Sequence, residues 1–360
     1  MQKVIVWGSG NVAKLMLSQL INTDEFDIVG IIDNNIEKQG KSVYGYKVYS
    51  PDLLKQCDFD RIIIMSDFYE EIKKQIIQIN EKLESKIENK YFFVKDALLK
   101  RYKDCENKEI KSIIRRIEDE GLKVFNYDFV KKYKEDDCDV NFDKDVGLYY
   151  ANHNGKAMYF SKEIDTKEKA KRYYNSLRME QDIQSPHRYI DEKVCIDDGA
   201  VVVDVGVAEG NFSLDIVDKV KKLYLIEADE NWCNALKITF KDYRDKVEII
   251  NGYLTSYDDG MLHKLDSIID EPVDFIKMDI EGAEYDALCG ADKVIDNSPN
   301  IKLAICSYHG DYDEVLIKSY MQQHDIEYYT SDGYMWFPYT TKQTLVSTKL
   351  VKGMIRGYKV

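Results

Sequence analysis

The sequence lacks the features that mark membrane and secreted proteins. It contains no run of about 18 apolar residues, the length that a membrane-spanning helix needs. Met1-Gln2-Lys3 leads directly into a strand-like segment at 4–7, without the charged and apolar stretches of a signal peptide. We therefore expect a cytoplasmic protein with no membrane insertion.

The sequence also lacks closely spaced cysteine pairs and has few prolines. The 7 cysteines are scattered along the chain, and none forms the Cys-x-x-Cys pair of a zinc or dithiol redox site. We interpret them as reduced thiols that mostly pack in the interior. With only 5 prolines, long flexible linkers are not expected.

An excess of positive charge is missing as well. The 51 Lys and Arg residues are outnumbered by 65 Asp and Glu residues, which gives a formal net charge of -14. A surface of this average sign repels phosphate backbones, so we do not expect a nucleic-acid partner. The basic segments 111–116 and 167–172 lie among acidic residues and are typical of solvated helix faces.

The order of apolar segments predicts an α/β protein with two sheets. At 360 residues the chain is longer than a usual single domain. Apolar strands alternate with helical patterns, which favours parallel sheets. We predict a smaller N-terminal parallel-sheet, Rossmann-like domain at 1–100, a helical and aromatic connecting region at 101–180, and a larger domain at 181–360.

The strands of these sheets are predicted from short apolar runs. In the N-terminal domain they cover 4–7, 27–32, 61–65 and 91–94, with helices at 14–20 and 67–83. In the C-terminal domain they cover 200–204, 222–226, 247–250, 274–278, 302–306, 327–330 and 344–348. No helical pattern separates the last two strands, so we expect them to form an antiparallel pair at one edge.

A glycine turn follows the first strand. Gly8-x-Gly10-x-x-Ala13, with Asp33 about 20 positions further on, meets the main conditions for a dinucleotide-binding turn. Glycines let the backbone approach a pyrophosphate, and Asp33 can accept hydrogen bonds from ribose hydroxyls. The same turn also serves to pack a helix on a sheet, and the sequence does not separate the two roles.

Hydride transfer is not expected at this turn. A suitably placed Tyr-x-x-x-Lys pair is missing, and no histidine precedes His153. The segment, including 44–49, resembles the N-terminal nucleotide-binding domains of bacterial sugar-modifying enzymes. That resemblance implies a nucleotide-sugar or regulatory site.

A second glycine turn follows the first strand of the C-terminal domain. Asp204 ends a buried apolar strand, and Gly206 and Gly210 lie in the turn after it. This arrangement fits S-adenosylmethionine, because a cofactor without phosphate needs a close approach to its amino-acid part. The Asp204 carboxylate can then meet its ammonium directly or through water.

The next two strands end on residues suited to the rest of this cofactor. Glu227 ends the second strand, where a carboxylate can accept from both hydroxyls of a ribose. Asn251 and Gly252 end the third strand, where they can border the adenine. The ordered series predicts an S-adenosylmethionine site.

The fourth and fifth strands end on candidates for proton removal. Asp279 and Glu281 follow the fourth strand, and His309 follows the fifth. A hydroxyl acceptor must lose a proton, and His309 is the best base because an ordinary histidine pKa is about 6.5. Asp279 or Glu281 would orient it. Alternatively, Asp279, Glu281 and His309 ligate a divalent metal ion that activates the hydroxyl.

These motifs together resemble the FkbM-type methyltransferases over roughly residues 180–340. The resemblance is carried by 204–212, Glu227, 277–284 and 307–309. It implies a seven-stranded Rossmann-like class I methyltransferase fold that acts on hydroxyl oxygens, often of sugars. A segment before the first strand is also similar, and we expect an acceptor site formed by His187, Arg188, Tyr189 and Tyr308.

We therefore expect an S-adenosylmethionine-dependent O-methyltransferase acting on a sugar, nucleotide-linked or part of a surface glycan. The partner would be a small-molecule sugar or nucleotide-sugar, and a homo-oligomer is left open. The alternatives are methylation of another small molecule, a lipid-linked glycan or a protein, and a non-catalytic nucleotide-binding scaffold.

Overall fold

The computed structural model divides the chain into two compact units. It describes residues 1–10, 13, 17, 26–66, 68–88, 98–310, 312–337 and 348–359. The N-terminal unit comprises Met1–Asn126 and Pro338–Leu350, and the C-terminal unit comprises Tyr127–Phe337 and Val351–Val360. The domain boundaries at residues 100 and 180 stay predictions. The predicted strand 91–94, most of the predicted helix 14–20, and 344–347 lie outside the described residues.

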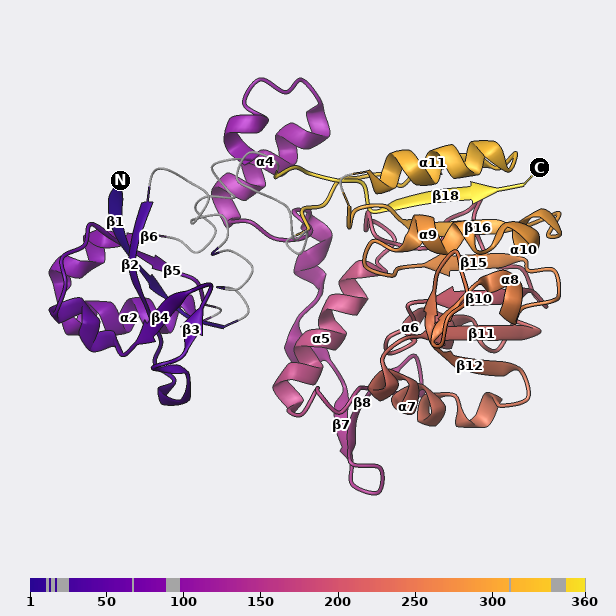
Figure 1. Cartoon of the computed structure of the whole chain (residues 1–360), viewed down its shortest axis with the longest axis horizontal. Coiled ribbons are helices and arrows are strands. Elements are labelled where there is room, and N and C mark those ends of the chain that lie inside the picture. Colours follow the sequence, from indigo (N-terminus) through magenta and orange to yellow (C-terminus); the bar gives the residue numbers. More distant parts are fainter. Residues whose placement is uncertain are drawn as a thin grey trace. The chain divides into compact units, whose positions relative to one another are not determined.

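The N-terminal unit contains the smaller, mostly parallel sheet that the sequence predicts (Figure 1). Strand β1 pairs in parallel with β2 on one side and with β5 on the other. The strand order is β3-β4-β2-β1-β5-β6, and the bounds are β1 Gln2–Trp7, β2 Phe26–Ile32, β3 Ser42–Val43, β4 Tyr46–Tyr49, β5 Arg61–Ile64 and β6 Ile87–Glu88. Helices α2 (Tyr69–Ile79) and α4 (Lys108–Glu120) belong to this unit.

The C-terminal unit contains the predicted seven-stranded sheet, in the order β12-β11-β10-β15-β16-β18-β17. Figure 1 shows β18, β16, β15, β10, β11 and β12 following one another in this order. The bounds are β10 Val201–Val205, β11 Lys222–Glu227, β12 Val247–Asn251, β15 Phe275–Met278, β16 Lys302–Cys306, β17 Glu327–Thr330 and β18 Met354–Tyr358. The first five strands are parallel, whereas β18 is antiparallel to both of its neighbours. The strand predicted at 327–330 therefore belongs to an antiparallel pair as expected, but its partner is β18 at 354–358 and not the predicted strand 344–348.

Helices and smaller sheets complete the C-terminal unit. The interior strand β10 is buried along its whole length, as expected for a parallel sheet covered on both faces. The helices are α5 Lys167–Glu180, α6 Asn211–Ile216, α7 Glu230–Thr239, α8 Leu265–Ile268, α9 Glu284–Cys289, α10 Asp292–Asp296 and α11 Asp313–Gln323. The short strands are β7 Val140–Asp143, β8 Leu148–His153, β9 Lys156–Tyr159, β13 Tyr253–Leu254 and β14 Leu262–His263.

All 7 cysteines fall within the described residues and are free thiols. Among the helices of the described chain, none combines the length and the apolar character needed to cross a bilayer.

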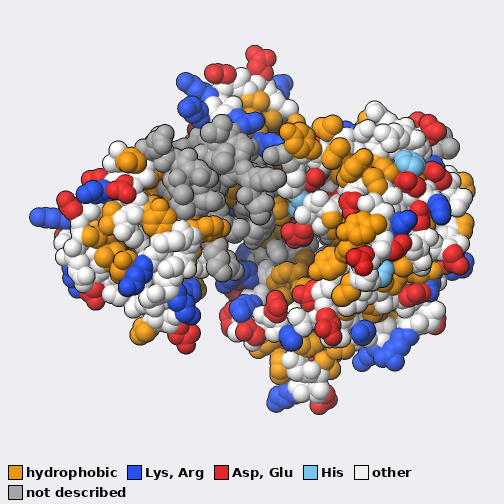
Figure 2. Space-filling view, in the orientation of Figure 1, with side chains coloured by type: hydrophobic (Ala, Val, Ile, Leu, Met, Phe, Trp, Pro, Cys, Tyr) orange, Lys and Arg blue, Asp and Glu red, His pale blue; other side chains and the backbone are white. Residues whose placement is uncertain are grey.

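Charges of both signs are mixed on the surface. On the face drawn in Figure 2, Lys and Arg side chains lie among Asp and Glu side chains. The basic segment 167–172 lies in α5, where Lys169 pairs with Asp165 at 2.7 Å. The lack of a nucleic-acid partner stays a prediction.

Arg356, in strand β18, holds the loop before β10 in place. This β18 side chain is 5% exposed, and its guanidinium donates to the carbonyl oxygens of Arg188 at 2.5 Å and Tyr189 at 3.1 Å. It also forms an ion pair with Asp191 at 3.1 Å. Since three groups of the loop meet one buried cation, β18 determines where the loop runs.

Replacing Arg356 should therefore destabilise the C-terminal unit. Arg356→Met keeps an apolar stem but removes the guanidinium from two carbonyls and from Asp191, whose carboxylate keeps the Tyr329 hydroxyl as a donor. The change should lower the free energy of unfolding by about 2 to 4 kcal/mol. Urea unfolding followed by circular dichroism measures the change. Arg244→Met, at an exposed arginine of the same unit, is the control and should stay within about 0.5 kcal/mol of the parent. Equal stability of both variants would show that the buried guanidinium does not hold the loop.

Candidate functional site

The C-terminal unit has a cleft at the carboxyl edge of its parallel strands. The strand order reverses direction between β10 and β15, and ligands of open α/β sheets bind at such a point. The cleft has a volume of about 310 Å3. We call it the C-terminal cleft; its lining includes Gly206, Ala208, Glu227, Trp232, Gly252, Tyr253, Asp279 and Glu281.

Gly206 allows the ends of strands β10 and β15 to lie close together. Its φ of +72° is one that side chains rarely adopt, and a Cβ at this position would lie 1.9 Å from the carbonyl oxygen of Asp279. Only a glycine fits between β10 and the turn after β15. Gly210 follows four residues later and precedes helix α6.

Glu227 presents a carboxylate that backbone amides hold in place. One oxygen accepts from the N–H of Ala208 at 2.8 Å, and the other accepts from the N–H of Asp229 at 2.8 Å. Each oxygen thus keeps acceptor capacity for another donor. The residue is 8% exposed and lines the C-terminal cleft, as the sequence predicts.

Asn251 and Gly252 support this carboxylate from the neighbouring strand. The Asn251 amide donates to the carbonyl oxygens of Glu227 at 2.9 Å and Ala228 at 3.0 Å. Gly252 lines the cleft, whereas Asn251 points into these backbone contacts. Asn251 therefore fastens the end of β12 to β11.

Asp204 is not among the residues that line the cleft and is paired with Lys277. Asp204 is 1% exposed, and its carboxylate accepts from Ser213 Oγ at 2.6 Å and meets Lys277 Nζ at 3.0 Å. The same ammonium donates to the carbonyl oxygen of Gly206 at 2.6 Å. Burial acts to lower the pKa of Lys277, but the charges of Asp204 and Asp279 outweigh it and raise the pKa above its usual value. A role of Asp204 toward a cofactor ammonium stays a prediction.

Asp279 is the hub of a buried polar cluster beside the cleft. Its carboxylate accepts from the hydroxyls of Tyr189 at 3.0 Å and Tyr308 at 3.4 Å. Burial acts to raise the pKa of Asp279, but His187, Lys277 and His309 outweigh it and hold the pKa below its usual value. Asp279 is thus an ionised carboxylate at neutral pH.

His309 lies between two carboxylates. Its Nδ1 is 3.0 Å from Glu284 Oε1, and its Nε2 is 3.5 Å from Asp279 Oδ1. Burial acts to lower the pKa of the His309 imidazole, but the hydrogen bond to Glu284 and the charge of Asp279 outweigh it and raise the pKa. The predicted meeting of Asp279 and His309 is therefore present in the structure.

Glu284, and not Glu281, completes this arrangement. Glu284 is fully buried, and its Oε1 also accepts from the backbone N–H of Ile280 at 2.9 Å. Glu281 has a φ of +60°, which turns the backbone so that its side chain is exposed along the cleft wall. The structure thus brings together Asp279, Glu284 and His309, whose ligand atoms all lie within 4.8 Å of one another.

Three of the four residues predicted for the acceptor site meet at Asp279. His187 Nε2 lies 2.8 Å from the hydroxyl of Tyr308, and burial lowers the pKa of His187 to about 4, so the ring is neutral. Arg188 does not join them. Its guanidinium donates to the carbonyl oxygens of Ile190 at 3.0 Å and Gln181 at 3.0 Å within its own loop.

Glu180 belongs to the same neighbourhood, although no motif in the sequence selects it. It is the last residue of α5, and burial together with the charges of Glu209 and Asp279 raises its pKa to about 8. A carboxyl with this pKa is largely protonated at neutral pH. The only signal in the sequence is its position next to Gln181, which begins the segment before the first strand.

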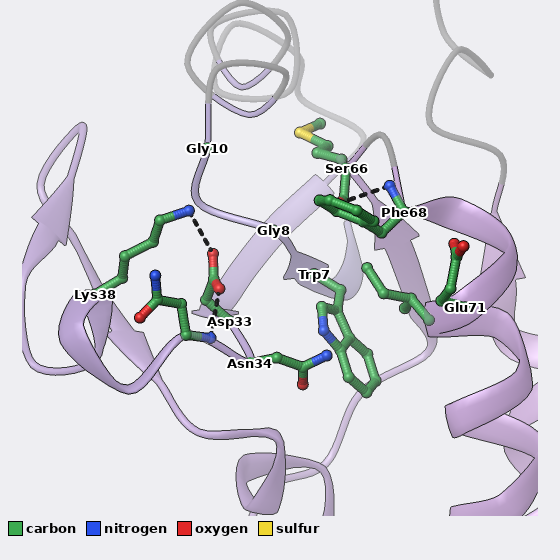
Figure 3. A pocket seen from close by; sticks show the side chains of 12 residues that line it. Trp7, Gly8, Gly10, Asp33, Asn34, Lys38, Ser66, Phe68 and Glu71 are labelled. Atoms are coloured by element: carbon green, nitrogen blue, oxygen red, sulfur yellow. Dashed lines mark hydrogen bonds and ion pairs between the residues drawn. The ribbon is translucent and has the colours of Figure 1, made fainter. Parts of the chain in front are cut away.

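The N-terminal turn borders a cleft of its own, of about 430 Å3. We call it the N-terminal cleft; Figure 3 shows Trp7, Gly8, Gly10, Asp33, Lys38 and Phe68 along its wall. A Cβ at Gly8 would lie 2.3 Å from the carbonyl oxygen of Met65, so this glycine is needed for strand packing. Ala13 is fully buried and does not line the cleft.

Comparison with solved structures gives low overall scores. A methyltransferase FkbM from Methylobacillus flagellatus shares 16% identity, with 99% of this chain and 90% of that chain covered and a TM-score of 0.47. An rRNA methylase from Streptococcus thermophilus shares 20% identity over 46% of this chain and 89% of that chain, with a TM-score of 0.33. UDP-D-quinovosamine 4-dehydrogenase from Vibrio fischeri shares 23% identity over 24% of this chain and 75% of that chain, with a TM-score of 0.21. The fold assignment therefore depends on the strand order, not on these scores.

Comparison with protein families is more informative. No curated protein matches the chain. The family model described as C2185-like, N-terminal, matches residues 1–88. The model described as Methyltransferase FkbM domain matches residues 137–328, which is just over half of the 360 residues. The chain therefore belongs to the FkbM methyltransferase family and is a methyltransferase.

Proposed function

We propose that this enzyme transfers the methyl group of S-adenosylmethionine to a hydroxyl oxygen of a sugar, carried by a nucleotide or a surface glycan. One observation carries the proposal: Asp279 lines the C-terminal cleft that Glu227 also lines, and it contacts His309. Asp279 thereby links the proposed cofactor-binding carboxylate, Glu227, to the proposed base, His309.

The residues of the C-terminal cleft fit the cofactor. Glu227 retains one acceptor position on each oxygen, which suits the two hydroxyls of a ribose. Gly206 lets the turn after β10 lie directly against the turn after β15, and Trp232 and Tyr253 supply rings along the wall. When bound, S-adenosylmethionine supplies an electrophilic methyl group.

His309 is suited to take the proton of the acceptor hydroxyl. Glu284 Oε1 accepts a hydrogen bond from a backbone N–H, which identifies this oxygen as an acceptor. The same oxygen faces His309 Nδ1, so we assign the ring hydrogen to Nδ1. Nε2 is then the basic atom of the neutral ring. After proton transfer, the charges of Asp279 and Glu284 stabilise the imidazolium.

The groups around Asp279 suit a polyhydroxylated acceptor. Tyr189 and Tyr308 place phenolic hydroxyls at this carboxylate, and the ring of Tyr308 packs against Phe337 with centroids 4.5 Å apart. Aromatic rings cover the apolar faces of sugars, while hydroxyls and carboxylates meet sugar hydroxyls. This combination supports a sugar as the acceptor.

A divalent metal ion is the second candidate for activating the acceptor. The ligand atoms of Asp279, Glu284 and His309 lie within 4.8 Å of one another, and two carboxylates with a histidine fit such an ion. The ion would lower the pKa of a bound hydroxyl. If the ion bound His309 through Nδ1, that nitrogen would give up its hydrogen bond to Glu284.

The cofactor part of the proposal predicts the effect of Glu227→Gln. An amide has only one acceptor oxygen and would face the N–H of Ala208 or Asp229 with its own N–H groups. The dissociation constant for S-adenosylmethionine should rise by about 10- to 100-fold in calorimetric titration. Glu230→Gln, at an exposed glutamate of α7, is the matched control and should leave the affinity unchanged. Equal affinities for both variants would remove Glu227 from the cofactor site.

The acceptor part predicts turnover of a sugar. A panel of nucleotide-sugars, incubated with S-adenosylmethionine, should yield S-adenosylhomocysteine and one methylated sugar, both detected by mass spectrometry. Failure of every sugar, including glycan fragments, despite tight cofactor binding would contradict the sugar assignment. So would faster methylation of a peptide or of a non-sugar hydroxyl compound.

If His309 is the base, its replacement should lower the rate, and the rate of the parent enzyme should depend on pH. His309→Asn should lower kcat by roughly 100- to 10,000-fold with little change in cofactor affinity, because asparagine cannot accept the proton. In the parent enzyme only neutral His309 is active. Since its pKa is raised, kcat/KM should increase with pH through a midpoint above the usual 6.5.

Two comparisons separate the base from other roles of His309. His324→Asn, at the end of α11, should keep the parent rate and pH profile because this histidine contacts Asp296 outside the cleft. Chelator should also leave the rate unchanged. Loss of activity with chelator and its recovery with one divalent ion would identify His309 as a metal ligand instead.

A further inference from the structure

We propose that the N-terminal unit binds a nucleoside diphosphate, free or within a nucleotide-sugar, in the N-terminal cleft. This binding is separate from methyl transfer and does not depend on the acceptor proposed above. It gives a role to a second cleft that the methyltransferase chemistry of the C-terminal unit does not use.

The N-terminal cleft lies where a parallel sheet offers a ligand site. The chain passes from β1 to β2 on one side and later returns to β5 on the other, so the strand order reverses beside β1. The cleft is lined by residues that follow these three strands, including Gly8, Asp33 and Ser66. Phosphorylated ligands of open α/β sheets bind at such a reversal.

Trp7 provides a buried donor that lacks an acceptor. The side chain lines the cleft and is 1% exposed, and its Nε1–H has no hydrogen-bond partner among the described residues. A buried donor without a partner destabilises a protein, so native structures usually supply one. An oxygen or ring nitrogen of a nucleotide would satisfy it.

Lys38 provides the charge that a diphosphate requires. Its ammonium lies 3.4 Å from Asp33 Oδ2 and 3.6 Å from the position that a Cβ at Gly10 would take. Figure 3 shows Lys38 and Asp33 pointing toward one another beside the Gly8–Gly10 backbone. An ammonium has three donors, so Lys38 can hold Asp33 and still meet a phosphate at the glycine turn.

Asp33 and Phe68 suit the remaining parts of a nucleotide. Among the described residues, Asp33 Oδ2 accepts from the backbone N–H and the hydroxyl of Ser9, whereas Oδ1 accepts from the N–H of Asn35 alone. Oδ1 therefore has room for one ribose hydroxyl. Phe68 lines the cleft with its side chain 65% exposed, and a planar base can stack on such a ring.

The extent of the sheet favours a single nucleotide over a dinucleotide. A dinucleotide fold joins two mononucleotide-binding halves of three strands each. Here β4, β2 and β1 form one half, while the other side offers β5 and the two-residue β6 within the described chain. The described part of the chain thus offers no equivalent half for the second nucleotide of NAD.

Calorimetric titration of the full chain tests this inference. ADP, GDP, CDP and UDP are compared with inorganic pyrophosphate and NAD. We expect at least one nucleoside diphosphate to bind about tenfold more tightly than pyrophosphate, and NAD to bind less tightly than that nucleotide. Lys38→Met and Phe68→Ala should each weaken binding by about tenfold, while their circular dichroism spectra match the parent.

Two control variants locate the site and separate this inference from the methyltransferase proposal. Lys41→Met, at an exposed lysine outside the cleft, and Glu227→Gln, in the C-terminal cleft, should leave nucleotide affinity unchanged. The inference is overturned if no nucleoside diphosphate binds at about 1 mM, if NAD binds most tightly, or if Lys41→Met weakens binding as much as Lys38→Met. Loss of binding in Glu227→Gln would assign the nucleotide to the C-terminal cleft and equally overturn it.

Discussion

The ion pair of Lys277 with Asp204 is the interaction on which the site depends. Both side chains are almost fully buried, and an unpaired charge at this depth would be strongly destabilising. The pair joins β10 to β15, and the same ammonium binds the carbonyl of Gly206. One cation therefore holds the turn after β10 against the strand that delivers Asp279.

The same charge organises the protonation of the neighbouring groups. Lys277 and His309 favour the carboxylate of Asp279, and that carboxylate in turn favours a proton on His309 and on Glu180. His187, which burial keeps neutral, lies on the other side of the cluster. Titratable groups whose pKa values are pushed apart in this way can divide acid and base roles at a single site.

Sequence patterns predicted the features that strand ends determine, and missed those that depend on side-chain direction. The apolar strands and the ordered turns predicted the sheet, the place of Glu227 and the meeting of Asp279 with His309, because parallel strands end at one edge. They offered Asp279 or Glu281 as the partner of His309. Asp279 does contact it, but the left-handed backbone of Glu281 turns that side chain outward, and Glu284 is the second partner. The roles of Lys277 and Glu180 arise from contacts between distant segments, which no local spacing reveals.

A crystal structure of the full chain with S-adenosylhomocysteine is the most direct measurement of the central claim. We expect both ribose hydroxyls within hydrogen-bond distance of the Glu227 carboxylate, and the sulfur on the side of the cleft bounded by Asp279. The nucleoside in another pocket, or a ribose that makes no contact with Glu227, would contradict the claim.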